Sequence, residues 1–547
     1  MLNKKIQIWI ALTLLVLGTA ALYGQFLRNP ILFDDLPFFM LDNEGNQPVS
    51  NYHFAILELR SLPYATLAWT KVWFGLNLLG FRIGNLMLHA AVVLALFFFL
   101  KVLFESVYAK RSENELLPSH AAFFAALLFA LHPVATYAAG YLVQRTIIMA
   151  TLFCLLAMLS YVYGSVRQKP LWLWMCIPFY YLAVFSKEHS IMLPAVLLAL
   201  TVLLHDDWRT RLKQRWAIFA GLFAIAVFAV WLKNLLGAVY EINAPEMLRG
   251  TAAGELAYPL SVMTQSWLFF KYALLWIFPN PAWMSVDIRV PFAQSLFSPY
   301  LLAAAAFVIW GMTAFYLLLK RGRSGLAGLA LLFPWLMFFT EFSAVRIQEP
   351  FVLYRSYLWA AGAFCLLPVI FFKIDARLAT LILAMVALAM LPVSMERLVT
   401  FSHPVLLWDD AEKLVKGRTD LPGGYRIYYN RGTELIKIDR PDQAIADLKQ
   451  AITLSKDFAE GYGNMGAAYL KKQDWNNAVS AFSKALEISD AGTKYLSNRY
   501  LFGRAMAYEN MGEIEKARAD YKVSCQRAGR GCDKTDLTSV MKIPPPN

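Results

Sequence analysis

The chain has 547 residues, of which 58% are apolar, 15% aromatic and only 16% charged. Soluble domains carry about 25% charged residues, and the apolar residues here gather in runs such as Ala90–Leu100 and Leu301–Leu319. The composition excludes a disordered chain and a single soluble globule, and it predicts a polytopic membrane protein. Residues 1–400 hold 29 basic and 19 acidic side chains, and residues 401–547 hold 22 and 19, so the net charge of +13 lies mainly in the apolar part. This distribution indicates membrane topology rather than nucleic-acid binding.

Eleven apolar stretches are long enough to cross a membrane, which takes about 17–25 residues. They start near Ile6, Arg82, Ala121, Leu142, Leu171, His189, Trp216, Pro299, Gly325, Ser356 and Leu378. A further stretch, Ser261–Phe278, is interrupted by polar side chains and ends at Pro279-Asn280-Pro281. We therefore expect this stretch to be re-entrant or interfacial.

The distribution of basic residues predicts the orientation. With Lys4-Lys5 inside, the inner loops collect 16 basic and 6 acidic residues, whereas the outer segments of residues 1–400 collect 13 of each. This arrangement follows the positive-inside bias. We expect an uncleaved first helix, a cytoplasmic N-terminus, a bacterial inner membrane, and a periplasmic location for everything after about Met395.

The C-terminal part is soluble in composition and repeats itself. Four residues recur after 34 positions, and related residues recur again after 39: Gly432, Ala444, Leu448 and Ala451; Gly466, Ala478, Phe482 and Ala485; then Ala505, Tyr508, Ala517 and Tyr521. Thirty-four residues is the tetratricopeptide (TPR) period, and the longer spacing implies a five-residue insertion around Ser489–Asn498. We expect a membrane domain over 1–400, a connecting segment over 401–424, and three TPR repeats over 425–547.

The cysteines fall into two groups. Cys154, Cys176 and Cys365 lie within apolar stretches and are expected to be small core residues. Cys525 and Cys532 lie in the outer tail, where an oxidising compartment favours a disulfide between them. Two unlinked thiols are the alternative.

Asp34 and Asp35 follow the first apolar stretch within Phe33-Asp34-Asp35-Leu36-Pro37. Adjacent carboxylates between aromatic residues can hold one raised pKa and serve as a general base. Equally, Asp35 can cap a short helix that begins at Leu36-Pro37, because Asp is favoured at the N-cap and Pro in the first turn.

Other ionisable or polar residues stand where outer loops meet apolar stretches: Glu58, Arg60, Arg82, Arg145, Lys187, Glu188, His189, Arg346 and Arg355. Arg and Lys at such positions can hold a phosphate. Internal pairing, Lys187 with Glu188 or Arg346 with Glu349, is the alternative for each one. As a set they predict a phosphate-handling outer cavity. Motifs for a nucleotide, a redox cofactor or a metal are absent from the sequence, so no cofactor is expected.

The order of these features resembles the GT-C superfamily of polyprenyl-phosphate-sugar-dependent glycosyltransferases, in particular the transmembrane-and-TPR O-mannosyltransferases and their bacterial relatives. The likeness covers nearly the whole chain. It rests on Phe33-Asp34-Asp35, Leu59–Pro63, Phe81–His89, Leu131–Val134 with Gln144-Arg145, Phe185–Glu188, Arg355–Leu358 and Tyr429–Gly432.

The resemblance implies an all-α fold, a GT-C-like transmembrane bundle followed by an α-solenoid, and an inverting glycosyltransferase. Such an enzyme moves a sugar from a polyprenyl phosphate to a hydroxyl, here of a protein Ser or Thr, outside the cytoplasm. We expect Asp34 to be the base, with Asp35 shaping its pKa or positioning the acceptor. The phosphate-binding candidates are Arg60, Arg145, Lys187 and Arg355, followed by Arg82 and Arg346, and the supporting residues are Glu188, His189 and Glu58. An apolar groove over Ser261–Phe278 would hold the lipid tail, and the repeats would present the protein acceptor.

Three rival interpretations remain. The acceptor can be a lipid or a glycan, or the transferred group can be a whole oligosaccharide. A different class is a non-enzymatic membrane scaffold, in which the repeats recruit envelope proteins and the charged loops only stabilise the bundle.

Overall fold

The computed structural model describes residues 4–39, 48–107, 115–235, 256–347, 349–489, 494–528 and 531–534. The chain is all-helical, with 80% helix, and the described residues contain no strand beyond an isolated bridge between Ile288 and Phe351. It divides into two compact units, unit 1 over Met1–His403 and unit 2 over Pro404–Asn547. Each unit is considered separately.

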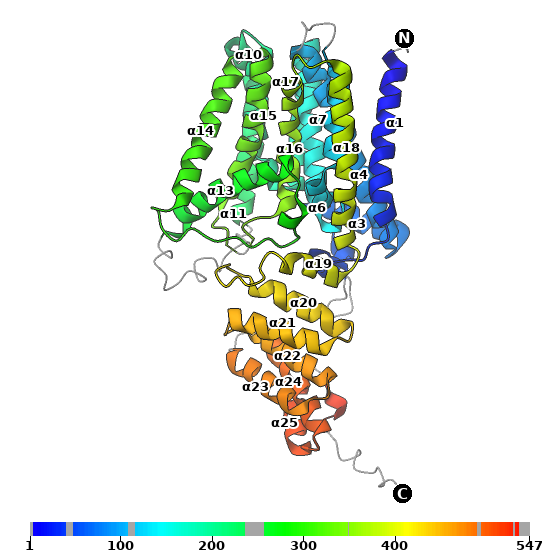
Figure 1. Ribbon diagram of the computed structural model, residues 1–547, viewed down its shortest axis with the longest axis vertical. Coiled ribbons are helices and arrows are strands. Elements are labelled where there is room, and N and C mark those ends of the chain that lie inside the picture. Colours follow the sequence, from blue (N-terminus) through cyan, green and yellow to red (C-terminus); the bar gives the residue numbers. More distant parts are fainter. Residues whose placement is uncertain are drawn as a thin grey trace. The chain divides into compact units, whose positions relative to one another are not determined.

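Long apolar helices make up most of unit 1 (Figure 1). Its α-helices are α1 (Lys4–Tyr23), α2 (Leu36–Phe39), α3 (Ser61–Phe74), α4 (Leu78–Val107), α5 (Pro118–Leu131), α6 (Thr136–Ala139), α7 (Arg145–Arg167), α8 (Pro170–Ser186), α9 (Leu193–Leu204), α10 (Trp208–Gln214), α11 (Trp216–Leu235), α13 (Ala257–Ile277), α14 (Pro299–Leu319), α15 (Gly322–Phe338), α16 (Ser356–Ala363), α17 (Leu367–Ile370) and α18 (Ala376–Thr400). Five short 3₁₀ turns matter for the site: η2 (Phe33–Asp35), η5 (Leu142–Gln144), η6 (Glu188–Ser190), η8 (Phe339–Ser343) and η9 (Leu353–Arg355).

The prediction of eleven spans is wrong in its count. Within the described residues, seven helices are long and apolar enough to cross a membrane, or up to nine if each of two bent pairs is one span. All eleven predicted stretches contain helix, but the one from Ala121 is broken by 53° between α5 and Pro133–Ala139. The one from Trp216 forms α11, which qualifies as a span only together with α10, from which it is bent by 69°. Two others, Pro170–Ser186 and Glu188–Leu204, are short.

Local chemistry explains these differences. Pro133 disfavours the helical conformation for the residue before it, and His132 is extended, with ψ of 132°. A 17-residue helix such as α8 is about 25 Å long, less than the roughly 30 Å of a hydrocarbon core. The number of apolar residues in a stretch describes its composition. To cross a membrane, the stretch must also form one sufficiently long and unbroken helix.

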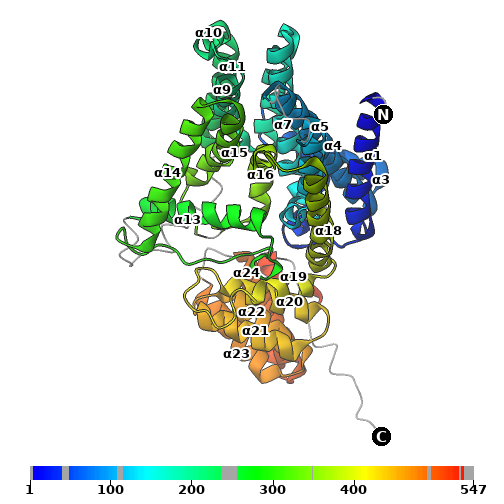
Figure 2. The same ribbon diagram turned by 45° about the horizontal axis from the view of Figure 1, so that its top comes forward.

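The Ser261–Phe278 stretch forms helix α13, which is not among the seven candidate spans. Figures 1 and 2 show α13 running across the direction of α14, α15 and α18, as an interfacial segment would. Its polar residues face protein: Thr264 Oγ1 accepts the Ala293 N–H at 3.0 Å, and Gln265 Nε2 donates to the Pro350 carbonyl at 2.9 Å. These bonds tie α13 to the loops on either side of α14 and α15.

Unit 2 stacks antiparallel helix pairs, as the 34-residue period predicts. Its helices are α19 (Pro404–Glu412), α20 (Tyr425–Lys437), α21 (Pro441–Leu454), α22 (Ala459–Lys471), α23 (Trp475–Ile488), α24 (Lys494–Asn510) and α25 (Ile514–Ala528). Helix α19 lies in the predicted connecting segment and belongs to this unit. Helix α24 has 17 residues against 13 in α20 and α22, so part of the extra sequence before the third repeat is an added helical turn.

In the first and in the third repeat, an ion pair joins the two helices in the same way. Arg431 on α20 binds both carboxylate oxygens of Asp447 on α21, at 2.7 and 2.8 Å. Arg504 on α24 repeats this with Asp520 on α25, at 2.7 and 2.9 Å. Such fork-shaped contacts fix the angle between two helices as well as their distance.

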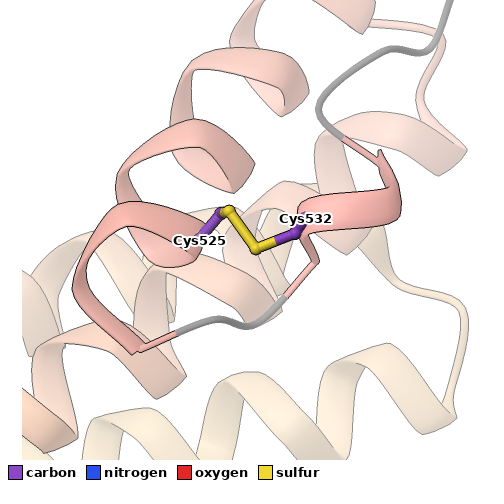
Figure 3. Close-up of a disulfide and its surroundings, with 2 residues drawn as sticks. All are labelled: Cys525 and Cys532. Carbon is purple, nitrogen blue, oxygen red and sulfur yellow. A yellow bond between two sulfur atoms is a disulfide. The ribbon is translucent and has the colours of Figure 1, made fainter.

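The end of the solenoid is closed by the disulfide expected from the sequence. Cys525 on α25 is bonded to Cys532 in the 3₁₀ turn η11 (Cys532–Lys534), as Figure 3 shows. Lys534 in that turn donates to Glu509 at 2.9 Å, and the Tyr521 hydroxyl donates to the same carboxylate at 2.6 Å. The turn therefore covers the last helix pair. The three other cysteines are buried thiols, as predicted.

The close approach of two helices at one glycine, Gly463, allows a direct test of the packing of the repeats. A Cβ on Gly463 of α22 would lie 2.1 Å from Cε1 of Tyr500, a residue of α24 that is 3% exposed. We expect Gly463→Leu to destabilise the stack by about 1–3 kcal/mol, because neither helix can give way. The check is thermal unfolding of the full-length protein, followed by proteolysis of the repeats. Ser480→Ala, at an exposed position of α23, is the control and should change stability by less than about 0.5 kcal/mol. Equal resistance of the two variants would contradict this packing.

Candidate functional site

The two adjacent aspartates have different surroundings. Asp35 is 1% exposed, and its carboxylate accepts the Val143 N–H at 2.8 Å and the Leu142 N–H at 3.4 Å. It therefore satisfies the first amides of η5, which leads into α7, and not those of the Leu36–Phe39 helix considered above. A buried aspartate at the start of a helical segment is a structural device that joins two parts of the chain.

Burial raises the pKa of Asp35 to about 6, and nearby Arg82 and the two amide donors limit the rise. The raised value means that the folded protein binds this proton more tightly than the unfolded chain does.

Asp34 points elsewhere. Its backbone N–H donates to the Tyr141 hydroxyl at 2.6 Å, and the residue is partly exposed. It lines a small pocket of about 20 Å³, whose other polar walls are Tyr141, Asp287, Arg289, Glu349 and Tyr354. Of the two carboxylates, Asp34 is the one that lines a pocket, and this pocket has room for about one water molecule.

Lys187 lies between α8 and η6 and is 6% exposed. Its Nζ is 3.4 Å from both Gln144 Oε1 and Thr146 Oγ1, and 4.9 Å from the centre of the Tyr354 ring. The pKa of Lys187 is lowered to about 7, mainly by burial and also by Arg60 and Arg355, whereas Glu188 and Asp34 oppose the shift. Lys187 thus lies within electrostatic reach of Asp34.

Arg60 and Glu188 form an ion pair beside Lys187. The guanidinium contacts both oxygens of the carboxylate, with Nε 3.1 Å from Oε2 and Nη2 bonded to Oε1. The two side chains are 19% and 20% exposed. Arg60 has a left-handed backbone, with φ of +63°, and its N–H donates to the Phe185 carbonyl at 2.7 Å. This anchoring places α3 next to the end of α8.

A buried carboxylate, that of Glu341 in η8, binds three of the predicted residues. Its oxygens lie 2.9 Å from Arg346 Nε, 3.1 Å from Arg355 Nη1 and 3.2 Å from His189 Nε2. Arg355 also contacts Glu349 at 3.3 Å. The Arg346–Glu349 pair considered from the sequence is replaced by Arg346–Glu341.

Arg82 and Arg145 do not fit the phosphate-binding role predicted for them. Arg82 donates to the carbonyls of Asn29, Gly140 and Pro30. Arg145, which is 2% exposed, donates to Asn85 Oδ1 at 2.7 Å, to the Phe81 carbonyl at 2.9 Å and to two threonine hydroxyls of α3. Their donors are engaged by internal oxygens. Arg145 therefore holds α3, α4 and α7 together, and Arg82 ties α4 to Asn29-Pro30 and to Gly140. Glu58 is exposed, two residues before Arg60, and its backbone carbonyl accepts the Ser61 N–H.

The sequence interpretation missed four kinds of contributor: Glu341, the Asp287–Arg289 pair, Tyr141 and Tyr354. Glu341 carries a detectable signal, because a lone acidic residue at the end of an apolar stretch is expensive unless it is paired. Asp287 and Arg289, joined at 2.6 Å, lie in an extended segment with no periodic pattern, and only the fold brings them to Asp34. Among the described residues, no three His, Cys, Asp or Glu side chains come together as a metal site requires.

A second, apolar cavity of about 390 Å³ lies in unit 1. One face of α13 lines it with Phe269, Tyr272, Ala273, Trp276 and Ile277. The spacing of these five residues is that of a single helical stripe. The remaining wall comes mainly from α14, α15, α16, α17 and α18.

Comparison with known proteins informs unit 2. The tetratricopeptide repeat family matches residues 425–458, 459–491 and 499–526, which confirms the three predicted repeats. A curated relative, the Hsp70-Hsp90 organizing protein of Triticum aestivum, is 37% identical over 75 residues. The match covers 13% of this chain and 13% of the length of that relative. No glycosyltransferase family matches the chain.

The class that follows from the fold and these matches is an all-helical protein with several helices able to span a membrane and a C-terminal TPR region. TPR repeats indicate protein–protein interaction.

Asp35 gives a pH test of the site's framework. Its pKa is about 6 in the folded protein and near 3.8 in an unfolded chain, so its contribution to the free energy of unfolding falls by about 3 kcal/mol as pH rises from about 4 to about 6. We expect Asp35→Asn to remove this part of the pH dependence. The measurement is the unfolding midpoint of both proteins between pH 4 and pH 7. Parallel pH profiles would show that Asp35 is not buried as described.

Proposed function

We propose that the protein is a membrane glycosyltransferase that moves a sugar from a polyprenyl-phosphate donor to a hydroxyl of a protein acceptor outside the cytoplasm. Asp34 is the base, and cations near it receive the lipid phosphate. The N-terminus is cytoplasmic, and unit 2 is periplasmic. This function combines the likeness of the sequence to the GT-C superfamily with the surroundings of Asp34.

The observation that carries the proposal is the different use of the two aspartates. The Asp35 carboxylate is occupied by backbone amides, whereas Asp34 lines a pocket and lies within electrostatic reach of the cation of Lys187. A general base needs access to the proton it removes, together with neighbours that favour its ionised form. Asp34 is partly exposed and has the Lys187 ammonium group nearby, whereas Asp35 is buried, and its carboxylate is bound to backbone amides.

The chemistry can be written step by step. The oxygen of the acceptor hydroxyl attacks the anomeric carbon of the sugar, and its proton passes to Asp34. The bond from the anomeric carbon to the phosphate oxygen breaks, and its electron pair leaves with the polyprenyl phosphate. The configuration inverts, and the added negative charge on the phosphate needs cations already in position.

Lys187, Arg60 and Arg355 are the proposed phosphate ligands. Within the described residues, the Lys187 ammonium group contacts neutral oxygens and a ring face, so a phosphate would gain a cation without displacing a carboxylate. Arg60 is the most accessible of the three and offers a planar fork suited to phosphate oxygens. Arg346 acts indirectly, because Glu341 joins it to Arg355. Glu188 orients Arg60, and His189 contacts Glu341.

The apolar cavity beside α13 supports a lipid donor. Its 390 Å³ are enclosed almost entirely by apolar and aromatic side chains, which suit an isoprenoid chain rather than a polar molecule. The cavity lies over the stretch predicted from the sequence to support the lipid tail.

The repeats support a protein as acceptor, since stacked TPR helices are protein-binding surfaces. The relative in Triticum aestivum is named for organizing two other proteins, and its likeness extends over 75 residues. A lipid or glycan acceptor, or transfer of a whole oligosaccharide, keeps the same chemistry at Asp34.

A non-enzymatic scaffold is the second candidate. It is favoured by the fact that the TPR region is the part of the chain matched by a known family. In a scaffold, the charged residues of unit 1 only stabilise the bundle, and the loss of Asp34 leaves partner binding intact.

The first test is transfer by the purified full-length protein from a short-chain polyprenyl-phosphate sugar to a Ser/Thr peptide. We expect Asp34→Asn to lower the rate by about 10²–10⁴-fold, the usual contribution of a general base, with unchanged expression. Asp35→Asn is the matched control and should retain transfer. Activity lost only in Asp35→Asn would reassign the base, and activity retained in both variants would overturn the mechanism.

The second test removes the repeats. Deletion of residues 425–547 is expected to spare turnover of a short peptide and to impair turnover of an intact protein, because the repeats contact the acceptor away from the reacting hydroxyl. The two rates are measured with the same donor. Equal losses on both acceptors would make the repeats a structural part of the enzyme.

A further inference from the structure

A third cavity, of about 180 Å³, lies against the turn that carries Glu188 and His189. Its polar wall consists of Glu188, His189, Thr340, Ser343 and Arg346. The segment 187–189 thus contributes to two sites, because Lys187 lies near Asp34 whereas the next two residues line this cavity. Thr340, Ser343 and Arg346 come from η8 and the loop after it.

We infer that this cavity is a subsite for the pyranose ring of the sugar, separate from the cations that take the phosphate. The inference rests on the proposed function and names where its donor places the sugar. Three properties of the cavity support it: size, the mixture of polar and apolar walls, and charge.

The size suits one six-membered ring. A protein cavity of about 150 Å³ is large enough to bind benzene, so about 180 Å³ accommodates a single ring of that kind with small substituents. An isoprenoid chain is far longer and has the 390 Å³ apolar cavity available to it.

The walls suit a ring with hydroxyl-bearing edges and apolar faces. The polar residues named above face an apolar wall of Ile191, Met192, Ala229, Val230 and Phe339. Hydroxyl groups on the ring edges can bond to the polar residues, and the apolar faces of the ring can pack against the apolar wall.

The charges suit a neutral ligand. Glu188 is paired with Arg60, and Arg346 is paired with Glu341, so each charged group on the wall has its counter-ion. A carboxylate on the wall opposes an incoming phosphate but accepts hydrogen bonds from hydroxyls. The cavity therefore selects the sugar rather than the phosphate of the donor.

Binding, rather than transfer, tests this subsite. The probes are citronellyl phosphate and citronellyl phosphates carrying glucose, mannose or N-acetylglucosamine, titrated into the full-length protein in nanodiscs. We expect at least one sugar-bearing probe to bind wild type about tenfold more tightly than citronellyl phosphate, as two or so net hydrogen bonds allow. Ala229→Phe fills the cavity and should bring that probe down to the affinity of citronellyl phosphate, whose own binding stays unchanged.

Two controls keep the result interpretable. Val227→Phe places the same phenyl ring at a 50%-exposed position of α11 and should retain the preference for the sugar. Thr340→Val removes one hydroxyl from the wall at nearly constant shape and should reduce the preference about threefold, which decides the matter if Ala229→Phe does not fold.

The contrary outcomes are distinct. No preference in wild type, or a preference unchanged by folded Ala229→Phe or by Thr340→Val, would overturn the subsite while leaving the proposed function standing. Failure of wild type to bind any of the four probes would overturn the proposed lipid-phosphate donor as well.

Discussion

The paired burial of charge at the ends of apolar helices is the constraint on which unit 1 depends. The Glu341 carboxylate, with none of its surface exposed, holds Arg346, Arg355 and His189 and so joins η8, η9 and η6. Removing one partner of such a buried pair typically costs about 3–5 kcal/mol. The same rule ties Arg60 to Glu188, so the turn carrying Lys187 is fixed from two sides.

This framework explains why residues of the same type have different uses. Arg82 and Arg145 donate to carbonyls and neutral side chains, so they hold parts of the fold together. Arg60 and Lys187 lie beside the Asp34 pocket, where a ligand can add to the existing contacts. Asp35 and Asp34 divide in the same manner, one bound to backbone amides and the other lining open space. In the proposed enzyme, one set of charged residues therefore stabilises the fold, and a second set carries out the chemistry.

The sequence predicted those parts of the structure that depend on local pattern. The 34-residue period identified the repeats, the oxidising side of the membrane indicated the Cys525–Cys532 bridge, and the polar interruptions set α13 apart. The count of spans failed because Pro133 breaks one apolar stretch and because two others, Pro170–Ser186 and Glu188–Leu204, form short helices. The internal contacts of Arg82 and Arg145 could not be predicted, because sequence does not reveal which carbonyls a guanidinium will meet. Asp287 and Arg289 were missed because their place beside Asp34 comes from contacts over hundreds of residues.

The central claim is that the chain transfers a sugar to a protein acceptor and that Asp34 is the base in this reaction. Its most direct test is intact mass spectrometry of envelope proteins from cells that carry either the wild-type protein or Asp34→Asn. The account predicts a protein that is lighter in the mutant by the mass of a sugar, which would identify acceptor and sugar class together. Identical masses, together with wild-type behaviour of the mutant in every phenotype, would contradict the account and favour the scaffold.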